Sequence, residues 1–249
     1  MSDVAWSRVR PVCPHCRSSF AADASGASCA ACGARYPVEN GILRLALGRE
    51  GAPGYDPHFF NTLERIEGRH FWFVARREVI LDALRRAVPD LERRGLFDIG
   101  CGSGWLSEAI ATELDGSGTV YAVELQESHI ENLRRRALPG IVPVLSEPGD
   151  VSLPENSLDV AMLHDVASHI DGSARKSFYE SVRSALRPGG RLVVFGPHGE
   201  AETMLDVLQA NGFVPVDRDL DDLTPDDLDL RLSEGIVFRP APEAAPQEP

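Results

Sequence analysis

The chain of 249 residues is 43% hydrophobic and 25% charged, which suits a soluble protein with one ordinary domain and one smaller unit. Its formal net charge of −13 argues against nucleic-acid binding as its main role, because binding to the phosphate backbone depends on clustered Lys and Arg. No apolar run is long enough to span a bilayer, and the N-terminus lacks the pattern of an export signal, so we expect a cytoplasmic protein with no membrane partner.

Two Cys-x-x-Cys pairs lie near the N-terminus, Cys13 with Cys16 and Cys29 with Cys32. Four thiolates at this spacing predict one tetrahedral zinc site, and because four cysteines fill every ligand position we expect a structural ion. Two disulfides are the alternative, which a reducing cytoplasm disfavours. We expect residues 1–48 to be a small zinc ribbon that depends on its metal, because so short a unit buries too little apolar surface on its own.

Residues 49–94 are expected to form a linker and a helical region. Three consecutive aromatic residues, 71–73, precede a pattern typical of an amphipathic helix. We expect two of these three rings to pack on the core, because buried aromatics are the commoner case. The remaining ring, with His70 or Arg76, is a candidate lid over a cofactor or substrate.

A short apolar run ends in a turn with three alternating glycines, Gly100, Gly102 and Gly104, and a helical pattern follows. Glycine reaches backbone conformations closed to other residues and lets a ligand approach the main chain, while the next helix presents free N–H groups. The turn therefore indicates a nucleotide site. With Asp98 before it, the turn resembles the first motif of the class I S-adenosylmethionine-dependent methyltransferases, and the resemblance extends over residues 98–238.

The resemblance implies an α/β fold for residues 95–239: a Rossmann-like, seven-stranded methyltransferase sheet with helices on both faces, preceded by the small zinc ribbon. Strands are expected at 119–123, 141–145 and 159–163, and helices at 126–138 and 174–186. We expect residues 240–249, rich in Pro and Ala, to be a disordered tail.

The resemblance also assigns parts of the cofactor S-adenosylmethionine to residues. The backbone of the glycine turn would hold its methionine end, and Glu124 at the end of the second strand would hold the ribose. Asp98 and Leu125 are further cofactor-binding residues in this assignment. A second pair, Asp150 and Val151, would hold the adenine. The alternatives are a solvent-facing Glu124 and an Asp150 that caps a helix.

The end of the fourth strand carries His164 and Asp165, and two further histidines, His169 and His198, follow the fourth and fifth strands. Ligands of open parallel sheets bind at this edge. Methyl transfer to a hydroxyl needs alignment and proton removal, so these four side chains are the candidate catalytic residues. The alternatives place His164 beside the methionine part of the cofactor and make His169 a core or capping residue.

The sequence favours a small-molecule acceptor, such as a sugar derivative or secondary metabolite methylated on oxygen or nitrogen. The architecture also resembles the ribosomal RNA guanine-N1 methyltransferases, which place a cysteine-rich zinc module before the same fold. The net charge argues against an RNA base as acceptor, and His164 and Asp165 stand where an Asn-Pro-Pro-Tyr-like motif for amino groups would be. A non-catalytic protein that binds the cofactor and activates a partner is a further alternative.

Overall fold

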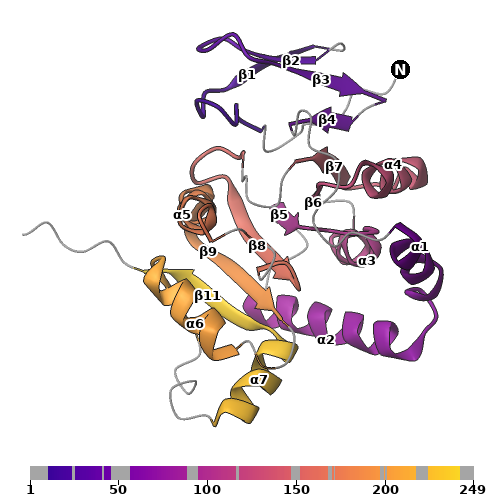
Figure 1. Cartoon of the computed structure of the whole chain (residues 1–249), viewed down its shortest axis with the longest axis vertical. Helices are drawn as coiled ribbons and strands as arrows, with labels where there is room; N and C mark the ends of the chain where they lie inside the picture. Colours follow the sequence, from indigo (N-terminus) through magenta and orange to yellow (C-terminus); the bar gives the residue numbers. More distant parts are fainter. Residues whose placement is uncertain are drawn as a thin grey trace, which may run out of the picture.

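The computed structural model describes residues 11–23, 26–40, 42–45, 57–88, 95–115, 118–146, 152–167, 170, 172–196, 199, 201–216 and 224–241. In these ranges a large mixed sheet runs through the molecule, and the first four strands form a small unit above one end of it (Figure 1). None of the helices in these ranges has both the length and the apolar character needed to cross a bilayer.

The described strands form one sheet in the order β1-β2-β3-β4-β7-β6-β5-β8-β9-β11-β10. The strands are β1 (Phe20–Asp23), β2 (Gly26–Cys29), β3 (Arg35–Glu39), β4 (Ile42–Arg44), β5 (Gly95–Ile99), β6 (Thr119–Glu124), β7 (Ile141–Leu145), β8 (Leu158–His164), β9 (Leu186–Phe195), β10 (Phe213–Pro215) and β11 (Ile236–Pro240). The helices are α1 (Pro57–Ile66), α2 (Phe71–Ala87), α3 (Trp105–Glu113), α4 (Glu127–Arg136), α5 (Arg175–Ala185), α6 (Ala201–Ala210) and α7 (Pro225–Glu234).

Seven neighbouring strands, in the spatial order β7-β6-β5-β8-β9-β11-β10, confirm the expected methyltransferase sheet. Strands β5 to β9 pair in parallel, whereas β11 runs antiparallel to both β9 and β10. Parallel pairing requires a crossover connection, and the described helices α3, α4 and α5 lie in the connections from β5 to β6, from β6 to β7 and from β8 to β9. The five residues of β5 are all buried, as expected for a central strand covered on both sides.

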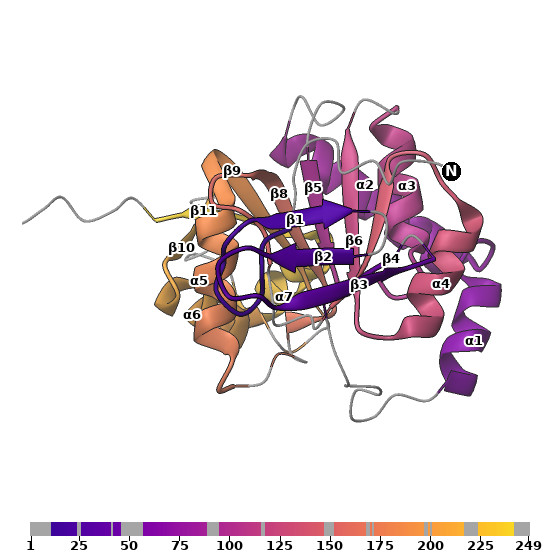
Figure 2. The same cartoon turned by 90° about the horizontal axis from the view of Figure 1, so that it is seen from above.

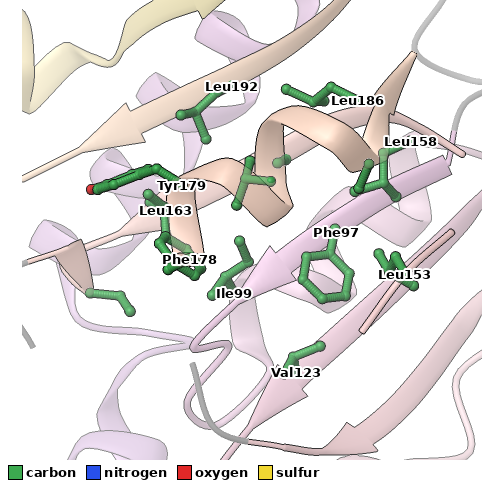
Figure 3. Packing of buried hydrophobic residues seen from close by; sticks show 14 of the residues in the cluster. Phe97, Ile99, Val123, Leu153, Leu158, Leu163, Phe178, Tyr179, Leu186 and Leu192 are labelled. Carbon is green, nitrogen blue, oxygen red and sulfur yellow. The ribbon is translucent and has the colours of Figure 1, made fainter. Parts of the chain in front are cut away.

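Alternating side chains of the central strands pack into two separate cores. Leu96 points to the face covered by α2 and α3, and its neighbour Phe97 points to the opposite face. On that opposite face Phe178 of α5 packs with Ile99 and Leu163 (Figure 3). The carboxyl ends of the parallel strands emerge between these two layers.

The N-terminal unit covers part of the sheet that no described helix covers. Strand β4 pairs in parallel with β7, so that Leu43 lies opposite Val144, and the unit lies across the end of the sheet (Figure 2). Described residues 152–157, which lead from β7 towards β8, contain no helix. Instead the core on that face joins side chains of the N-terminal unit to those of β5, β6 and β7: Tyr36, Leu43 and Leu45 with Phe97, Tyr121, Val142 and Val144.

The expectation that two of the three aromatic rings at 71–73 pack on the core is wrong. Phe71 is 77% exposed and Trp72 is 48% exposed. The buried residues of α2 begin only at Ile80, so the first turns of the helix contribute no fully buried side chain to the core. Phe73 is partly buried and packs edge-on against Trp105, with ring centroids 6.0 Å apart.

The acidic segment near the C-terminus contains a helix that the sequence analysis did not predict. Thr224 caps α7, and Pro225 occupies its first turn together with two aspartates, which are favourable beside the positive end of the helix dipole. This start signal was present in the sequence but was hidden by the overall acidity. At the C-terminal end β11 continues to Pro240, which pairs with Phe213, so the last strand passes the expected boundary at residue 239 by one residue.

Candidate functional site

The glycine turn joins β5 to α3 and is closed by backbone hydrogen bonds. The N–H groups of Gly100 and Cys101 both donate to the carbonyl of Val123 on β6, at 2.9 Å. A Cβ on Gly100 would lie 2.4 Å from Val166, and one on Gly104 would lie 2.5 Å from Leu133, whereas nothing lies within 4 Å of a Cβ on Gly102. Two of the glycines therefore allow tight packing, and the middle one borders open space.

Asp98 lies behind the turn and is almost fully buried. Its carboxylate accepts a hydrogen bond from the hydroxyl of Ser107 on α3. Burial raises the pKa of Asp98 to about 7, and the hydrogen bond from Ser107 and repulsion by Glu124 make smaller contributions of opposite sign. The side chain is thus poised between its neutral and charged forms near neutral pH.

Glu124 ends β6 beside the turn, and backbone N–H groups hold its carboxylate. Its Oε2 accepts from Gly102 at 3.0 Å, and its Oε1 accepts from Leu125 at 2.7 Å and from Gln126 at 3.0 Å. These bonds join the glycine turn to the start of α4. Leu125, predicted as a cofactor residue, contributes its backbone N–H to this arrangement.

His164 and Asp165 lie at the carboxyl end of β8, and the distance from His164 Nε2 to Asp165 Oδ2 is 3.4 Å. Neither His164 Nε2 nor Asp165 Oδ1 has a hydrogen-bond partner among the described residues. Asp165 has φ 54°, in the left-handed region that Asp tolerates better than most residues. Burial lowers the pKa of His164, and the nearby Asp165 opposes this effect, so the imidazole is neutral at pH 7.

Arg76 of α2 lies beside this pair, as a candidate lid residue would. Its guanidinium carbon lies 6.0 Å from the ring centroid of Trp72 and 5.9 Å from that of Phe195. Its Nη1 donates to the carbonyl of Ser233, and burial lowers its pKa. The exposed Trp72 and the half-buried Arg76 therefore stand at the same edge of the sheet as His164.

Two contacts at the turn escaped the sequence analysis. Glu67, just after α1, accepts a hydrogen bond from the hydroxyl of Ser103, and Arg136 of α4 donates to the Ser103 carbonyl. Burial raises the pKa of Glu67. No motif in the sequence marks Glu67, because its partner lies 36 positions away. Four predicted site residues, Asp150, Val151, His169 and His198, lie outside the described residues.

The four cysteines of the N-terminal unit come together as predicted. Their Sγ atoms all lie within 4.8 Å of one another, with Cys13 and Cys32 3.6 Å apart and Cys16 and Cys29 3.3 Å apart. A tetrahedral site with Zn–S bonds of about 2.3 Å has sulfur–sulfur edges of about 3.8 Å, close to these separations.

The backbone around the two cysteine pairs repeats the same turn. Arg17 and Gly33, each four positions after the first cysteine of its pair, donate an N–H to that cysteine's carbonyl and have positive φ angles of 60° and 74°. Cys13 and Cys29 in turn donate to the carbonyl five positions ahead. Two equivalent turns that face one another present four sulfurs to one point, which fits a single metal ion.

Asp98 gives a prediction for the pH dependence of stability. Its pKa rises from the ordinary 3.8 to about 7 on folding, so its stabilising effect is complete below pH 3.8 and is lost as the pH rises through 7. Between pH 5 and pH 8 the wild-type chain should lose about 3 kcal/mol more unfolding free energy than Asp98→Asn, which stays neutral. Urea unfolding at both pH values measures this difference, and equal changes in the two proteins would contradict it.

Comparisons with known proteins agree with this geometry. Residues 96–190 match the family model of a methyltransferase domain. An uncharacterised 37.1 kDa protein in transposon TN4556 of Streptomyces fradiae is 30% identical over 130 residues, which cover 51% of this chain and 36% of that protein. A protein-L-isoaspartate O-methyltransferase of Aeropyrum pernix is 34% identical over 103 residues, which cover 40% of this chain and 37% of that enzyme. The chain thus spans little more than a third of the length of these curated relatives.

Among solved structures, a TehB-like SAM-dependent methyltransferase from Corynebacterium glutamicum has a TM-score of 0.55 and 18% sequence identity. The likeness covers 74% of this chain and 100% of that one, and at this identity it concerns the fold. Residues 96–190 match a methyltransferase domain, and the sheet has the α/β, Rossmann-like fold of the solved SAM-dependent methyltransferase.

Proposed function

We propose that this protein transfers a methyl group from S-adenosylmethionine to a small-molecule acceptor. The main support for this proposal is the hydrogen bond between the glycine turn and Glu124, in which Gly102 N donates to Glu124 Oε2 at 3.0 Å. The two groups follow adjacent parallel strands, β5 and β6, at the edge where ligands of such sheets bind. This places an open backbone and an acceptor carboxylate side by side.

The residues fit the proposed cofactor. The turn from Gly100 to Gly104 offers backbone to the methionine end, and Glu124 offers its carboxylate to the ribose hydroxyls. A carboxylate has about four acceptor positions, and backbone N–H groups use three of them here, so ribose hydroxyls take the free position and compete with the Gly102 N–H. Asp150 and Val151 remain the proposed adenine residues.

When bound, S-adenosylmethionine supplies a methyl group on a positively charged sulfur, which is already a good leaving group. The protein then has to align the acceptor and remove its proton. His164 is neutral at pH 7, so we assign it the role of general base, with Asp165 Oδ2, 3.4 Å from His164 Nε2, orienting the imidazole ring. His169 and His198 are the further candidates for this role.

The acceptor is proposed to be a small molecule because the chain carries a net charge of −13, which disfavours a polyanionic substrate. Arg76 acts electrostatically on His164 and lies 6.0 Å from the Trp72 ring, so the two side chains offer a cation and an aromatic face to such a molecule. Methylation of an RNA base remains the competing function, and the two are separated by the acceptor assay below.

Calorimetry with S-adenosylmethionine tests the cofactor site. The wild-type chain should bind, and Glu124→Gln should bind about 10-fold or more weakly, because it loses charge-assisted hydrogen bonds to the ribose. Glu155→Gln, an exposed change of the same kind, is the matched control and should bind like the wild type. A wild-type chain that shows no binding at millimolar cofactor would exclude the proposed activity.

Release of S-adenosylhomocysteine tests the acceptor class and the base. We expect turnover with hydroxyl- or amine-bearing small molecules and none with RNA, and we expect His164→Gln to lower kcat by about 100-fold or more. Activity should fall as the pH drops through the lowered pKa of His164, because the protonated imidazole no longer accepts a proton. Turnover of RNA alone, or an unchanged kcat in the variant, would refute these assignments.

We further propose that the four cysteines bind one structural zinc ion. Freshly purified protein should contain one zinc per chain, and chelation should lower the melting temperature of the whole sheet, since the N-terminal unit completes its core. Cys16→Ser should lose the metal, whereas Cys101→Ser, which changes the cysteine of the glycine turn, should retain it. Much less than one zinc per wild-type chain would overturn the assignment.

A further inference from the structure

Arg44 ends β4, the strand that joins the N-terminal unit to the methyltransferase sheet. It lies opposite Leu145 of β7, and Leu145 lies opposite Glu124 of β6. The three residues therefore form one row across three neighbouring strands. Backbone hydrogen bonds also connect the ends of these three strands: Leu45 N donates to the Leu145 carbonyl, and Ser146 N donates to the Glu124 carbonyl.

The guanidinium of Arg44 joins two carboxylates from different parts of the chain. Its Nε lies 2.6 Å from Oε2 of Glu39 on β3, and its Nη2 donates to Oε1 of Glu127, the first residue of α4. The Arg44 side chain is only 13% exposed. The bond to Glu127 raises the pKa of Arg44 and lowers that of Glu127, so both groups stay charged over the neutral range.

The start of α4 is the part of the molecule that holds Glu124. The N–H groups of Leu125 and Gln126, directly before Glu127, donate to Glu124 Oε1. Gln126 is the N-cap residue, and its side chain makes no capping hydrogen bond. The first turn of α4 therefore depends on contacts from outside the helix, and Arg44 provides a charged one.

An apolar contact runs beside the charged one. Ile42 of β4 packs with Ile130 of α4 and with Leu145, and Cys101 of the glycine turn packs against this cluster. Strand β4 thus contacts both elements that border the proposed ribose site, through side chains two positions apart on the same face of the strand.

We propose that Arg44 is a positioning residue of the ribose site, which holds Glu127 and thereby fixes the two N–H groups that aim the Glu124 carboxylate. The inference rests on the proposed S-adenosylmethionine site and deepens it. It gives the N-terminal unit a second task, because the strand that covers the sheet also sets the geometry of the cofactor site.

The test compares two ligands by calorimetry, S-adenosylhomocysteine and its 2′,3′-dideoxy analogue, which lacks the hydroxyls that Glu124 would bind. Arg44→Met should raise the dissociation constant of S-adenosylhomocysteine about 10-fold. The dissociation constant of the dideoxy analogue should stay within about 2-fold of the wild-type value. Arg44→Lys should recover part of the loss. The double variant Arg44→Met with Glu124→Gln should bind S-adenosylhomocysteine no more weakly than Glu124→Gln alone, because both changes act through one carboxylate.

Two further variants distinguish a failure of the Arg44 proposal from a failure of the proposed S-adenosylmethionine site. Arg35→Met, an exposed arginine of the same N-terminal unit, should bind both ligands like the wild type. Glu127→Met removes the same contact from the helix side and should reproduce the Arg44→Met pattern, which covers the case in which Arg44→Met does not fold. Equal weakening of both ligands, or no weakening of either, would overturn the inference alone, whereas a wild-type chain that binds neither ligand would overturn the proposed function as well.

Discussion

A parallel sheet has to be covered on both faces, and this constraint explains why two dissimilar units form one core. Helices α2 and α3 cover one face of the central strands, and α5 covers β8 and β9 on the other. The remaining surface, over β5 to β7, is covered by Tyr36, Leu43 and Leu45 of the N-terminal unit. A metal that holds this unit together would therefore stabilise the whole sheet, although the cysteines lie far from the cofactor site in sequence.

The two acids of the proposed cofactor site have opposite environments. Asp98 is buried behind the turn, and this burial raises its pKa to about 7 although the hydroxyl of Ser107 donates a hydrogen bond to it. Glu124 is partly exposed, and its carboxylate accepts hydrogen bonds from three backbone N–H groups. The buried Asp98 suits a packing role that supports the turn, whereas the partly exposed carboxylate of Glu124 suits contact with hydroxyl donors. Strand-end position alone did not distinguish these roles in the sequence.

The sequence predicted what local patterns and a known motif determine. The third strand of the domain was predicted at 141–145, where β7 lies, and the cysteine spacing predicted the cluster of four sulfurs. The parallel pairing of β4 with β7 and the contact of Glu67 with Ser103 join distant segments, and no local pattern specifies such a register. The prediction for the aromatic run at 71–73 was wrong because the turns of α2 that meet the core begin only at Ile80, and a local run of aromatic residues does not specify that position.

The central claim is that a ribose lies between the glycine turn and Glu124, and a crystal structure of the chain with S-adenosylhomocysteine tests it most directly. The account predicts both ribose hydroxyls within about 3.2 Å of the Glu124 carboxylate, with the homocysteine part along the open side of Gly102. A ligand bound elsewhere, or one whose ribose faces solvent while Glu124 keeps its three backbone bonds, would contradict the account.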